Sequence, residues 1–249
     1  SLTVRVCDSV TCEINGANEL AQNLDDYFKG TVRIQKVPCI GRCQSAPVAV
    51  VKFNPIDNAN LKNVKQAVDA KEYDPSIPKY ISMKEYIDKG GYKLFNKLKN
   101  NEIDSDKVLT ELESSNLRGL GGAGFPAGKK WRILKDQPSP RLLAINIDEG
   151  EPGTFKDRFY LEMDPHRFFE GMLIASEVVG IDKVYIYLRD EYAAVRTLMT
   201  KELSQLRDKF KDQIPEIELR RGAGAYICGE ESAMIESIEG KKGMPRLRP

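Results

Sequence analysis

Apolar and polar positions alternate with two different periods in the first 70 residues of the chain. Apolar side chains at every second position predict half-buried strands over residues 2–6 and 31–36, and a spacing of four predicts a helix over residues 17–28. A short apolar run at residues 47–53 is typical of a buried strand, and residues 61–68 are expected to form a second helix. The order strand, helix, strand, strand, helix predicts a small α/β unit.

The pattern changes at residues 71–82, which contain two prolines and few core-forming side chains and are expected to form a linker. Beyond it, segments of helical period and short apolar runs alternate, which predicts a mainly parallel sheet with helices on both faces. The expected helices cover residues 83–88, 93–99, 105–114, 165–179 and 192–210, and the expected strands cover residues 141–147, 183–188 and 216–219. The strand at residues 141–147 is expected to be buried. We therefore expect two domains: residues 1–70, which resemble a thioredoxin-like fold, and residues 83–249, an α/β domain.

The composition is that of a globular protein with a sizeable core: 249 residues, 41% of them hydrophobic and 30% charged. A formal net charge of +1 gives no sign of nucleic acid or an anionic membrane as a partner. No apolar run reaches 18 residues and no signal peptide is recognisable, so we expect a cytoplasmic protein without direct membrane insertion. The only histidine, His166, is expected at a helix start with Asp164 as its cap.

Four of the five cysteines form two pairs, Cys7 with Cys12 and Cys39 with Cys43, and each pair follows an expected strand. An odd count of cysteines argues against a disulfide framework. Loops at the same edge of one sheet can bring four thiolates together, and four thiolates suit a [2Fe–2S] cluster. Structural zinc, which more often uses cysteines spaced two residues apart, is the alternative. The isolated Cys228 is expected to be a buried structural thiol.

Residues 118–131 contain five glycines in ten positions, two lysines and the only tryptophan. Glycine lets the backbone approach a ligand closely, and exposed N–H groups before a helix form a nest for anionic oxygen. The stretch Gly119-x-Gly121-x-x-Gly124 matches the dinucleotide fingerprint, but a helix rather than a strand is expected before it. We predict a site for a phosphate-bearing aromatic cofactor; a flexible loop without a ligand is the alternative.

Two further loops follow the expected elements in a way that is typical of ligand sites. Residues 146–158 bring polar and acidic groups to the carboxyl end of a strand, where open α/β sheets bind ligands. A solvated acidic turn is the alternative. Residues 222–229 are again glycine-rich and lead into a helix that starts with Glu230 and Glu231. These carboxylates either complement the helix dipole or contact a nucleotide.

The loops at residues 118–131, 146–158 and 222–248 together closely resemble the NADH-binding flavoprotein subunit of respiratory complex I and its relatives. The cysteine-bearing unit resembles the thioredoxin-like [2Fe–2S] ferredoxin that accompanies that subunit. Both units on one chain resemble the diaphorase subunit of NAD-dependent molybdenum or tungsten formate dehydrogenases, or of NAD-reducing hydrogenases. The resemblance covers nearly the whole chain. It implies a Rossmann-like α/β domain that binds FMN and NAD(H), preceded by a ferredoxin domain.

The resemblance also implies a ligand for each group of candidate residues, and no residue acting as nucleophile or general base. FMN contacts are implied for Gly119, Gly121, Gly122, Lys130, Asn146, Asp148, Glu149, Tyr226, Gly229 and Glu230. NAD(H) contacts are implied for Phe125, Glu151, Glu231 and Arg248. Ligation of the [2Fe–2S] cluster is implied for Cys7, Cys12, Cys39 and Cys43. Glu149 and Glu151 are expected to position the nicotinamide and to tune the flavin.

The implied function is that of a diaphorase module, an NAD-dependent oxidoreductase subunit that passes electrons between NAD(H), FMN and iron–sulfur clusters. We expect it to reduce NAD+ with electrons from formate, oxidised in a partner molybdenum or tungsten subunit, with a small ferredoxin-like subunit as a further candidate partner. Membership of complex I or of an NAD-reducing hydrogenase is the alternative. An alternative of another class is a non-catalytic assembly module with a structural zinc site.

Two positions depart from the resembling subunits. Leu120 stands where many relatives have arginine, and with the fused ferredoxin this favours the formate type. Ile133 stands where some relatives have an aromatic residue. The resembling subunits continue beyond the position of Pro249 and carry a further Cys-x2-Cys-x2-Cys motif. We therefore expect the sequence to be the N-terminal part of a longer subunit, with a [4Fe–4S] cluster only in the remainder.

Overall fold

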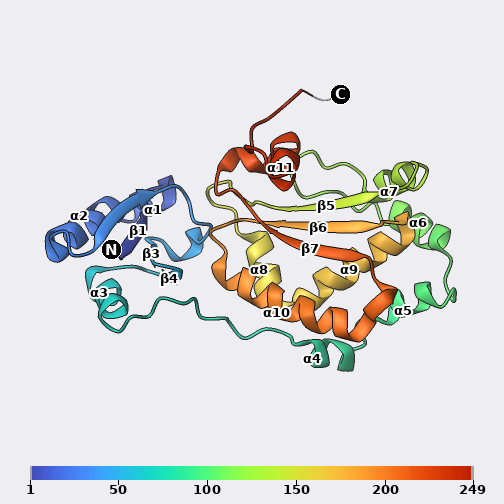
Figure 1. The fold of residues 1–249 in the computed structure, drawn as a ribbon, viewed down its shortest axis with the longest axis horizontal. Coiled ribbons are helices and arrows are strands. Elements are labelled where there is room, and N and C mark those ends of the chain that lie inside the picture. The colour runs from blue at the N-terminus through green and yellow to red at the C-terminus, as the bar shows by residue number, and fades with distance from the viewer. Residues whose placement is uncertain (1, 248–249) are drawn as a thin grey trace.

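The computed structural model describes residues 2–247, which form two α/β units joined by an extended segment (Figure 1). The first unit has a four-stranded sheet in the order β2-β1-β3-β4, in which β1 and β2 are parallel and the other pairs are antiparallel. Its elements are β1 (Thr3–Cys7), α1 (Val10–Ile14), α2 (Ala17–Phe28), β2 (Arg33–Val37), β3 (Ala49–Val51), β4 (Asn54–Ile56) and α3 (Leu61–Asp69).

The apolar pattern explains how this unit packs. Helix α2 has the predicted bounds, and it buries Leu20, Leu24 and Phe28 against the sheet, since these side chains share one helical face. The run at residues 47–53 forms only β3, and the chain then reverses into β4, which was not predicted. The turn residues are Lys52 and Phe53, which lack the asparagine–glycine signal of a two-residue hairpin.

Residues 71–82 contain no regular secondary structure and lead to a group of short helices. The Tyr80 hydroxyl donates to Glu202 at 2.6 Å, which ties the end of this segment to the second unit. The helices are α4 (Met83–Asp88), α5 (Lys93–Lys99), α6 (Ser105–Ser114) and α7 (Ala127–Lys135), and the first three have the predicted bounds. None of the helices that the structure describes is long and apolar enough to cross a membrane.

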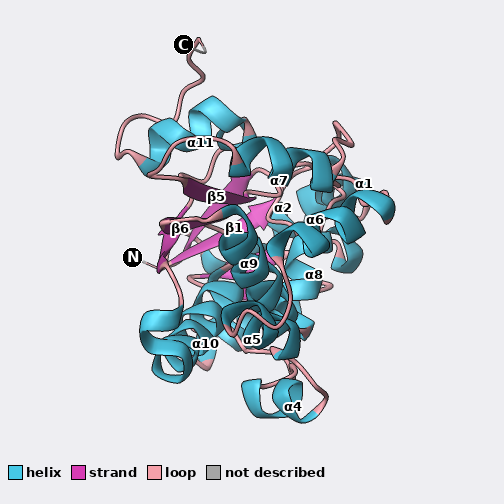
Figure 2. Cartoon of the chain, turned by 90° about the vertical axis from the view of Figure 1, so that its right-hand side faces the viewer, coloured by secondary structure: helices cyan, strands magenta, loops and turns pink. Residues whose placement is uncertain are grey.

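The second unit is built on a parallel three-stranded sheet in the order β5-β6-β7, with most of its helices on one face (Figure 2). This confirms the predicted parallel sheet. Helices α8, α9 and α10 lie together below the sheet in Figure 1, and α11 lies above it. The elements are β5 (Leu142–Ile147), α8 (Lys156–Met163), α9 (Pro165–Val179), β6 (Lys183–Leu188), α10 (Ala193–Phe210), β7 (Glu216–Arg221) and α11 (Glu231–Ile238).

The prediction of a buried strand over residues 141–147 is wrong. Strand β5 pairs only with β6, and its alternate side chains Leu142, Ala144 and Asn146 are exposed. An edge strand contacts the helix layer with only one of its two faces, so an apolar run does not establish burial on both. The polar end of β5 is therefore open to a ligand.

The only histidine lies in the core instead of at a reactive surface. Asp164 caps α9 by accepting from the Arg167 N–H, as predicted, and His166 is fully buried in the first turn of that helix. Its ring nitrogens contact the Tyr92 hydroxyl at 2.8 Å and Glu202 at 2.9 Å. Burial lowers the pKa of His166, because removal from water disfavours the charged ring. His166 thus joins α5, α9 and α10.

Candidate functional site

The glycine loop, residues 118–126, is a closed turn directly before α7. The Gly119 N–H donates to the Phe125 carbonyl at 3.0 Å, which closes the base of the loop. Gly122 and Gly124 have φ values of 105° and 61°, a region that favours glycine. A Cβ built at Gly121 or Gly122 meets no atom within 4 Å, so both backbones face open space. The loop has the free backbone surface that a phosphate or ribityl group requires.

The carboxyl end of β5 supplies the opposite wall. The Asn146 side chain donates to the Gly229 carbonyl at 2.8 Å and thereby joins β5 to the second glycine-rich loop. Asp148 is buried, with 3% of its surface exposed, and a Cβ at Gly229 would come 3.4 Å from its carboxylate. Burial raises the pKa of Asp148 to about 6, Arg189 acts against that rise, and Glu191 adds to it.

The two predicted tuning carboxylates have different surroundings in the acidic loop, which we define as residues 148–158. Glu149 accepts hydrogen bonds from the Asp157 and Arg158 N–H groups at 2.8 and 3.2 Å and from the Tyr192 hydroxyl at 2.7 Å. It therefore caps α8, which has no side-chain cap at its own N-cap residue. Glu151 is exposed and accepts from the Tyr226 hydroxyl at 2.6 Å.

These loops surround a cavity of about 670 Å³, which we call the glycine-loop cavity. Its volume lies within the range of sites for drug-sized ligands and cofactors. It is lined by Leu120, Gly121, Gly122, Asn146, Glu149, Gly150, Glu151, Thr154, Lys156, Asp157, Tyr226, Ile227, Gly229 and Glu230. Seven of the ten residues expected to contact FMN thus line one cavity, and so does Glu151 from the NAD(H) group.

The remaining expected residues lie elsewhere. Gly119 forms the base of the glycine loop, and Lys130 lies exposed in the first turn of α7. Phe125, Glu231 and these two residues do not line the cavity, although all four belong to elements that border it. Glu230 lines the cavity while its carboxylate accepts from the Ser232 and Ala233 N–H groups as the cap of α11. Capping the helix is the role expected for Glu230 if it does not contact a nucleotide.

Arg248 lies outside the described residues. Asp148 faces a neighbouring cavity of about 530 Å³, to which Cys39, Arg189 and Glu191 also contribute. Gly150, Glu151 and Tyr226 line both cavities, so the two spaces share a wall.

The four N-terminal cysteines come together at the edge of the first sheet, and we call this group the cysteine centre. The sulfurs of Cys39 and Cys43 are 3.4 Å apart, and the thiols of Cys12 and Cys39 are close enough to Cys7 to shift its pKa. Two of the sulfurs accept from backbone N–H groups: Cys39 from Gly41 at 3.4 Å and Cys43 from Gly153 at 3.2 Å.

The donor set fits a two-iron cluster. A [2Fe–2S] cluster distributes four thiolates over two irons, and N–H groups directed at sulfur stabilise the negative charge of such a cluster. Four converging thiols, three of them buried, with backbone donors directed at Cys39 and Cys43, match that requirement.

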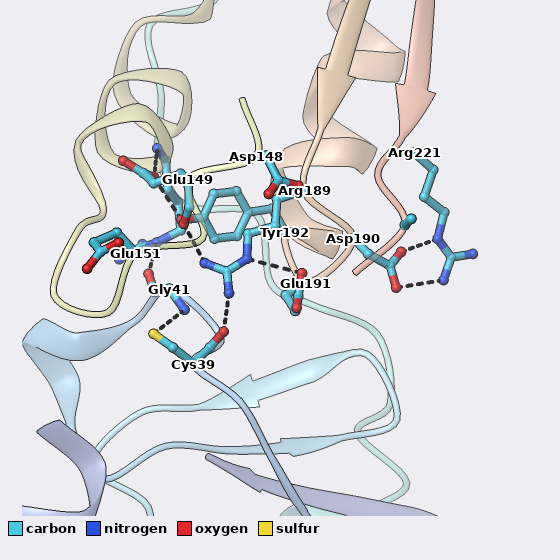
Figure 3. A network of polar contacts seen from close by, with 12 residues as sticks. Cys39, Gly41, Asp148, Glu149, Glu151, Arg189, Asp190, Glu191, Tyr192 and Arg221 are labelled. Atoms are coloured by element: carbon cyan, nitrogen blue, oxygen red, sulfur yellow. Dashed lines mark hydrogen bonds and ion pairs between the residues drawn. The ribbon is translucent and has the colours of Figure 1, made fainter. Parts of the chain in front are cut away.

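Polar contacts join the cysteine centre to the acidic loop. Arg189 donates to the carbonyl of Cys39 and, at 2.6 Å, to that of Glu149, and its Nε contacts Glu191 at 3.1 Å (Figure 3). The Arg158 Nε donates to the Gly41 carbonyl at 3.0 Å. These contacts place the cysteine centre beside the wall that the two cavities share.

The sequence reasoning missed Arg158, Arg189 and Tyr192. Arg189 directly follows β6, the strand that pairs with β5, and carboxyl ends of parallel strands gather at one edge of a sheet. The same rule that selected Asn146 and Asp148 would therefore have selected Arg189. No sequence signal identifies Arg158 or Tyr192, because both act on a unit more than 100 residues away.

Comparisons with known proteins agree with this geometry. Residues 112–249 match the family described as the Nuo51 FMN-binding domain, and residues 1–72 match the thioredoxin-like [2Fe–2S] ferredoxin family. The chain is 44% identical over 180 residues to an NADH-quinone oxidoreductase subunit of Aquifex aeolicus (strain VF5), covering 69% of this chain and 42% of that protein. It is 42% identical over 169 residues to an NADH-quinone oxidoreductase subunit of Rhizobium meliloti (strain 1021), covering 64% of this chain and 40% of that protein.

A solved structure of an NAD+-reducing [NiFe]-hydrogenase in the air-oxidized state contains a similar chain. The similarity has a TM-score of 0.83 at 30% sequence identity and covers 100% of this chain and 47% of the hydrogenase chain. The chain thus spans less than half the length of the relatives it matches.

Proposed function

Because the chain belongs to the Nuo51 FMN-binding domain family, we propose that it passes electrons between NAD(H), FMN and a [2Fe–2S] cluster. One observation carries the proposal: the glycine-loop cavity and the space beside the cysteine centre share the wall formed by Gly150, Glu151 and Tyr226. A flavin in the first cavity therefore lies next to the cluster. Flavins supply hydride exchange with nicotinamide and single-electron exchange with iron–sulfur clusters.

The residues of the chain bind and orient the cofactors in this proposal. The backbones of Gly121 and Gly122 hold the phosphate and ribityl groups, and Lys130 supplies positive charge from the first turn of α7. Asn146 and Asp148 contact the ring system from the end of β5. The remaining FMN contacts come from Gly119, Glu149, Tyr226, Gly229 and Glu230, and the NAD(H) contacts from Phe125, Glu151, Glu231 and Arg248. Cys7, Cys12, Cys39 and Cys43 ligate the cluster.

We also propose the domain limits that this function requires. Residues 1–70 form the electron-transfer domain that carries the cluster, residues 71–82 are the linker, and residues 83–249 bind FMN and NAD(H). The contacts of Arg158 and Arg189 with the carbonyls near Cys39 support a fixed relation between the two domains.

The test is anaerobic addition of NADH to the chain reconstituted with FMN and iron–sulfur. We expect loss of flavin absorbance followed by a rhombic [2Fe–2S] EPR signal. Bound zinc in equal amount to protein, with no EPR signal after dithionite, would instead support the assembly module. Flavin loss without a cluster signal would leave a simple flavoprotein and contradict the proposed relay.

The partner that supplies or takes the electrons is a finer proposal. We retain formate oxidised at a molybdenum or tungsten subunit as the sequence-based choice. The alternatives are a hydrogenase partner and a complex I partner. Between these two, the similarity to the hydrogenase chain, which covers the whole of this chain, favours the hydrogenase partner. Purification of the protein with its native partners, followed by NAD+ reduction assays with formate and with hydrogen, separates these possibilities. NADH-driven quinone reduction in the same preparation identifies the complex I type.

A further inference from the structure

One sulfur of the cysteine centre receives a backbone hydrogen bond from the other domain. Cys39 accepts from the Gly41 N–H at 3.4 Å, within the cysteine-bearing unit. Cys43 instead accepts from the Gly153 N–H at 3.2 Å, across 110 residues of sequence.

Gly153 lies in the loop that lines the glycine-loop cavity. Glu151, two residues earlier, contributes to both cavities and holds Tyr226, and Thr154, the next residue, lines the glycine-loop cavity. The Thr154 N–H and hydroxyl both donate to the Glu151 carbonyl, at 3.1 and 2.7 Å, so residues 151–154 form one tight turn. A ligand that moves Glu151 therefore also moves the Gly153 N–H.

The rest of the domain contact does not depend on Gly153. Arg158 and Arg189 bind the carbonyls of Gly41 and Cys39, as described above. Tyr192 packs so closely on Gly41 that a Cβ there would lie 2.4 Å from its hydroxyl oxygen. The two domains thus stay together when the turn at residues 151–154 shifts, and the Gly153 contact can change by itself.

We propose that the hydrogen bond from Gly153 to Cys43 couples nucleotide binding at Glu151, in the wall of the glycine-loop cavity, to the reduction potential of the cluster. Reduction adds an electron to the cluster, and an N–H directed at a ligating sulfur stabilises the more negative state. Shortening this bond raises the potential, and lengthening it lowers the potential. Gly153 is a positioning residue for the cluster, and the proposal rests on the function proposed above.

The test is an EPR-monitored redox titration of the chain with FMN and cluster bound, comparing wild type with Gly153→Ala. Gly153 has a φ of 91°, which strains alanine, while a Cβ there meets no atom within 4 Å. The variant therefore moves the turn without a steric clash. Gly30→Ala is the matched control, since Gly30 has a φ of 82° and equally open surroundings but no contact with sulfur.

We expect Gly153→Ala to lower the midpoint potential of the cluster by ~59 mV. For a one-electron couple this is a tenfold lower ratio of reduced to oxidised cluster at a fixed potential. Gly30→Ala should leave the potential unchanged. Equal potentials in the two variants would overturn the proposal. If wild type shows no [2Fe–2S] signal at all, the proposed function fails instead, so the two failures are distinguishable.

The second arm uses ADP-ribose, which has the nucleotide but not the nicotinamide and is therefore redox-inert. Saturating ADP-ribose should shift the cluster potential of wild type and of Gly30→Ala, and at least half of that shift should be lost in Gly153→Ala. An unchanged wild-type potential, with ADP-ribose binding demonstrated by equilibrium dialysis, would overturn the coupling even if Gly153→Ala loses its cluster.

Discussion

The cysteine centre and the glycine-loop cavity are adjacent but built in different ways. The cysteine centre is largely buried, and its sulfurs lie together and accept backbone N–H groups at Cys39 and Cys43. The glycine-loop cavity is formed by three exposed loops whose side chains mostly bind other parts of the protein. The first site therefore depends on side-chain chemistry at a few positions, and the second on backbone shape. Substitutions should separate the two.

The largest effect is expected from Cys39→Ser. Loss of one thiolate removes a ligand of the cluster, so we expect complete loss of the [2Fe–2S] EPR signal with FMN binding retained. Cys228→Ser is the matched control, because Cys228 is equally buried but contacts the Gly243 carbonyl and belongs to no group of thiols. Iron content and flavin absorbance of both variants check this. Loss of FMN in Cys39→Ser would show that the sites are not separable.

Arg189 contacts both the cysteine centre and the acidic loop, so its substitution should weaken the contact between the two domains. The Arg189 side chain is 6% exposed and binds two carbonyls and Glu191. Arg189→Ala leaves these groups unpaired, and we expect a loss of about 3 kcal/mol in the free energy of unfolding. Urea denaturation measures it.

Arg221→Ala is the control for that experiment, since Arg221 forms an ion pair with Asp190 at an exposed site. Its loss should cost less than about 1 kcal/mol. Equal losses in the two variants would mean that Arg189 does not hold the domains together.

Asp148 gives the cavity wall a pH dependence. Its pKa is raised by burial to about 6 in the folded chain, whereas an unfolded aspartate titrates near 4. The folded state therefore binds the proton more tightly. The contribution of Asp148 to the stability of the flavin-free chain should be greatest below pH ~4, fall as the pH rises to ~6, and stay lower above it, by about 3 kcal/mol.

The measurement is urea denaturation of wild type and Asp148→Asn between pH 4 and pH 8. The variant should lack this component of the pH dependence and gain stability relative to wild type at pH 7. Parallel pH profiles would contradict the assignment of the effect to Asp148.

The smallest effect is expected from Glu151→Gln. Glu151 is exposed and has one hydrogen-bonding neighbour, Tyr226, so folding should not depend on its charge. We expect NADH to bind about tenfold more weakly, ~1.4 kcal/mol, with an unchanged melting temperature. Glu149→Gln is the contrasting variant: it weakens the cap of α8 and should lower the melting temperature. Unchanged NADH affinity and unchanged flavin potential in Glu151→Gln would refute its role.

Local pattern was enough to predict most of the fold. Helices α2, α4, α5, α6 and α9 have the predicted bounds, because their apolar faces and caps lie within the segment itself. Helix α8 was missed because its capping carboxylate, Glu149, lies six residues before the N-cap residue Phe155 and outside any cap signature. The exposure of β5 was missed because neighbouring strands, and not the strand's own residues, determine which faces are covered.

The candidate site divides in the same way. Sequence motifs located the loops, and most of the residues expected to contact FMN line one cavity. The motifs did not indicate that Glu149 would bind α8 and Tyr192, or that Gly153 would bind Cys43. These contacts join segments far apart in the chain, and local patterns in a single sequence do not indicate which distant residues are in contact.

The contacts across the domain boundary also have a consequence for the order of folding. The Cys43–Gly153 and Cys39–Arg189 contacts join residues that are 110 and 150 positions apart. During synthesis the N-terminal domain emerges first, and contacts between distant residues form slowly. The ribosome thus releases Cys39 and Cys43 long before Arg189 and Gly153, the residues that contact them, have been synthesised. The cluster can be delivered to an open, accessible domain, and the later arrival of β6 and the acidic loop then encloses it.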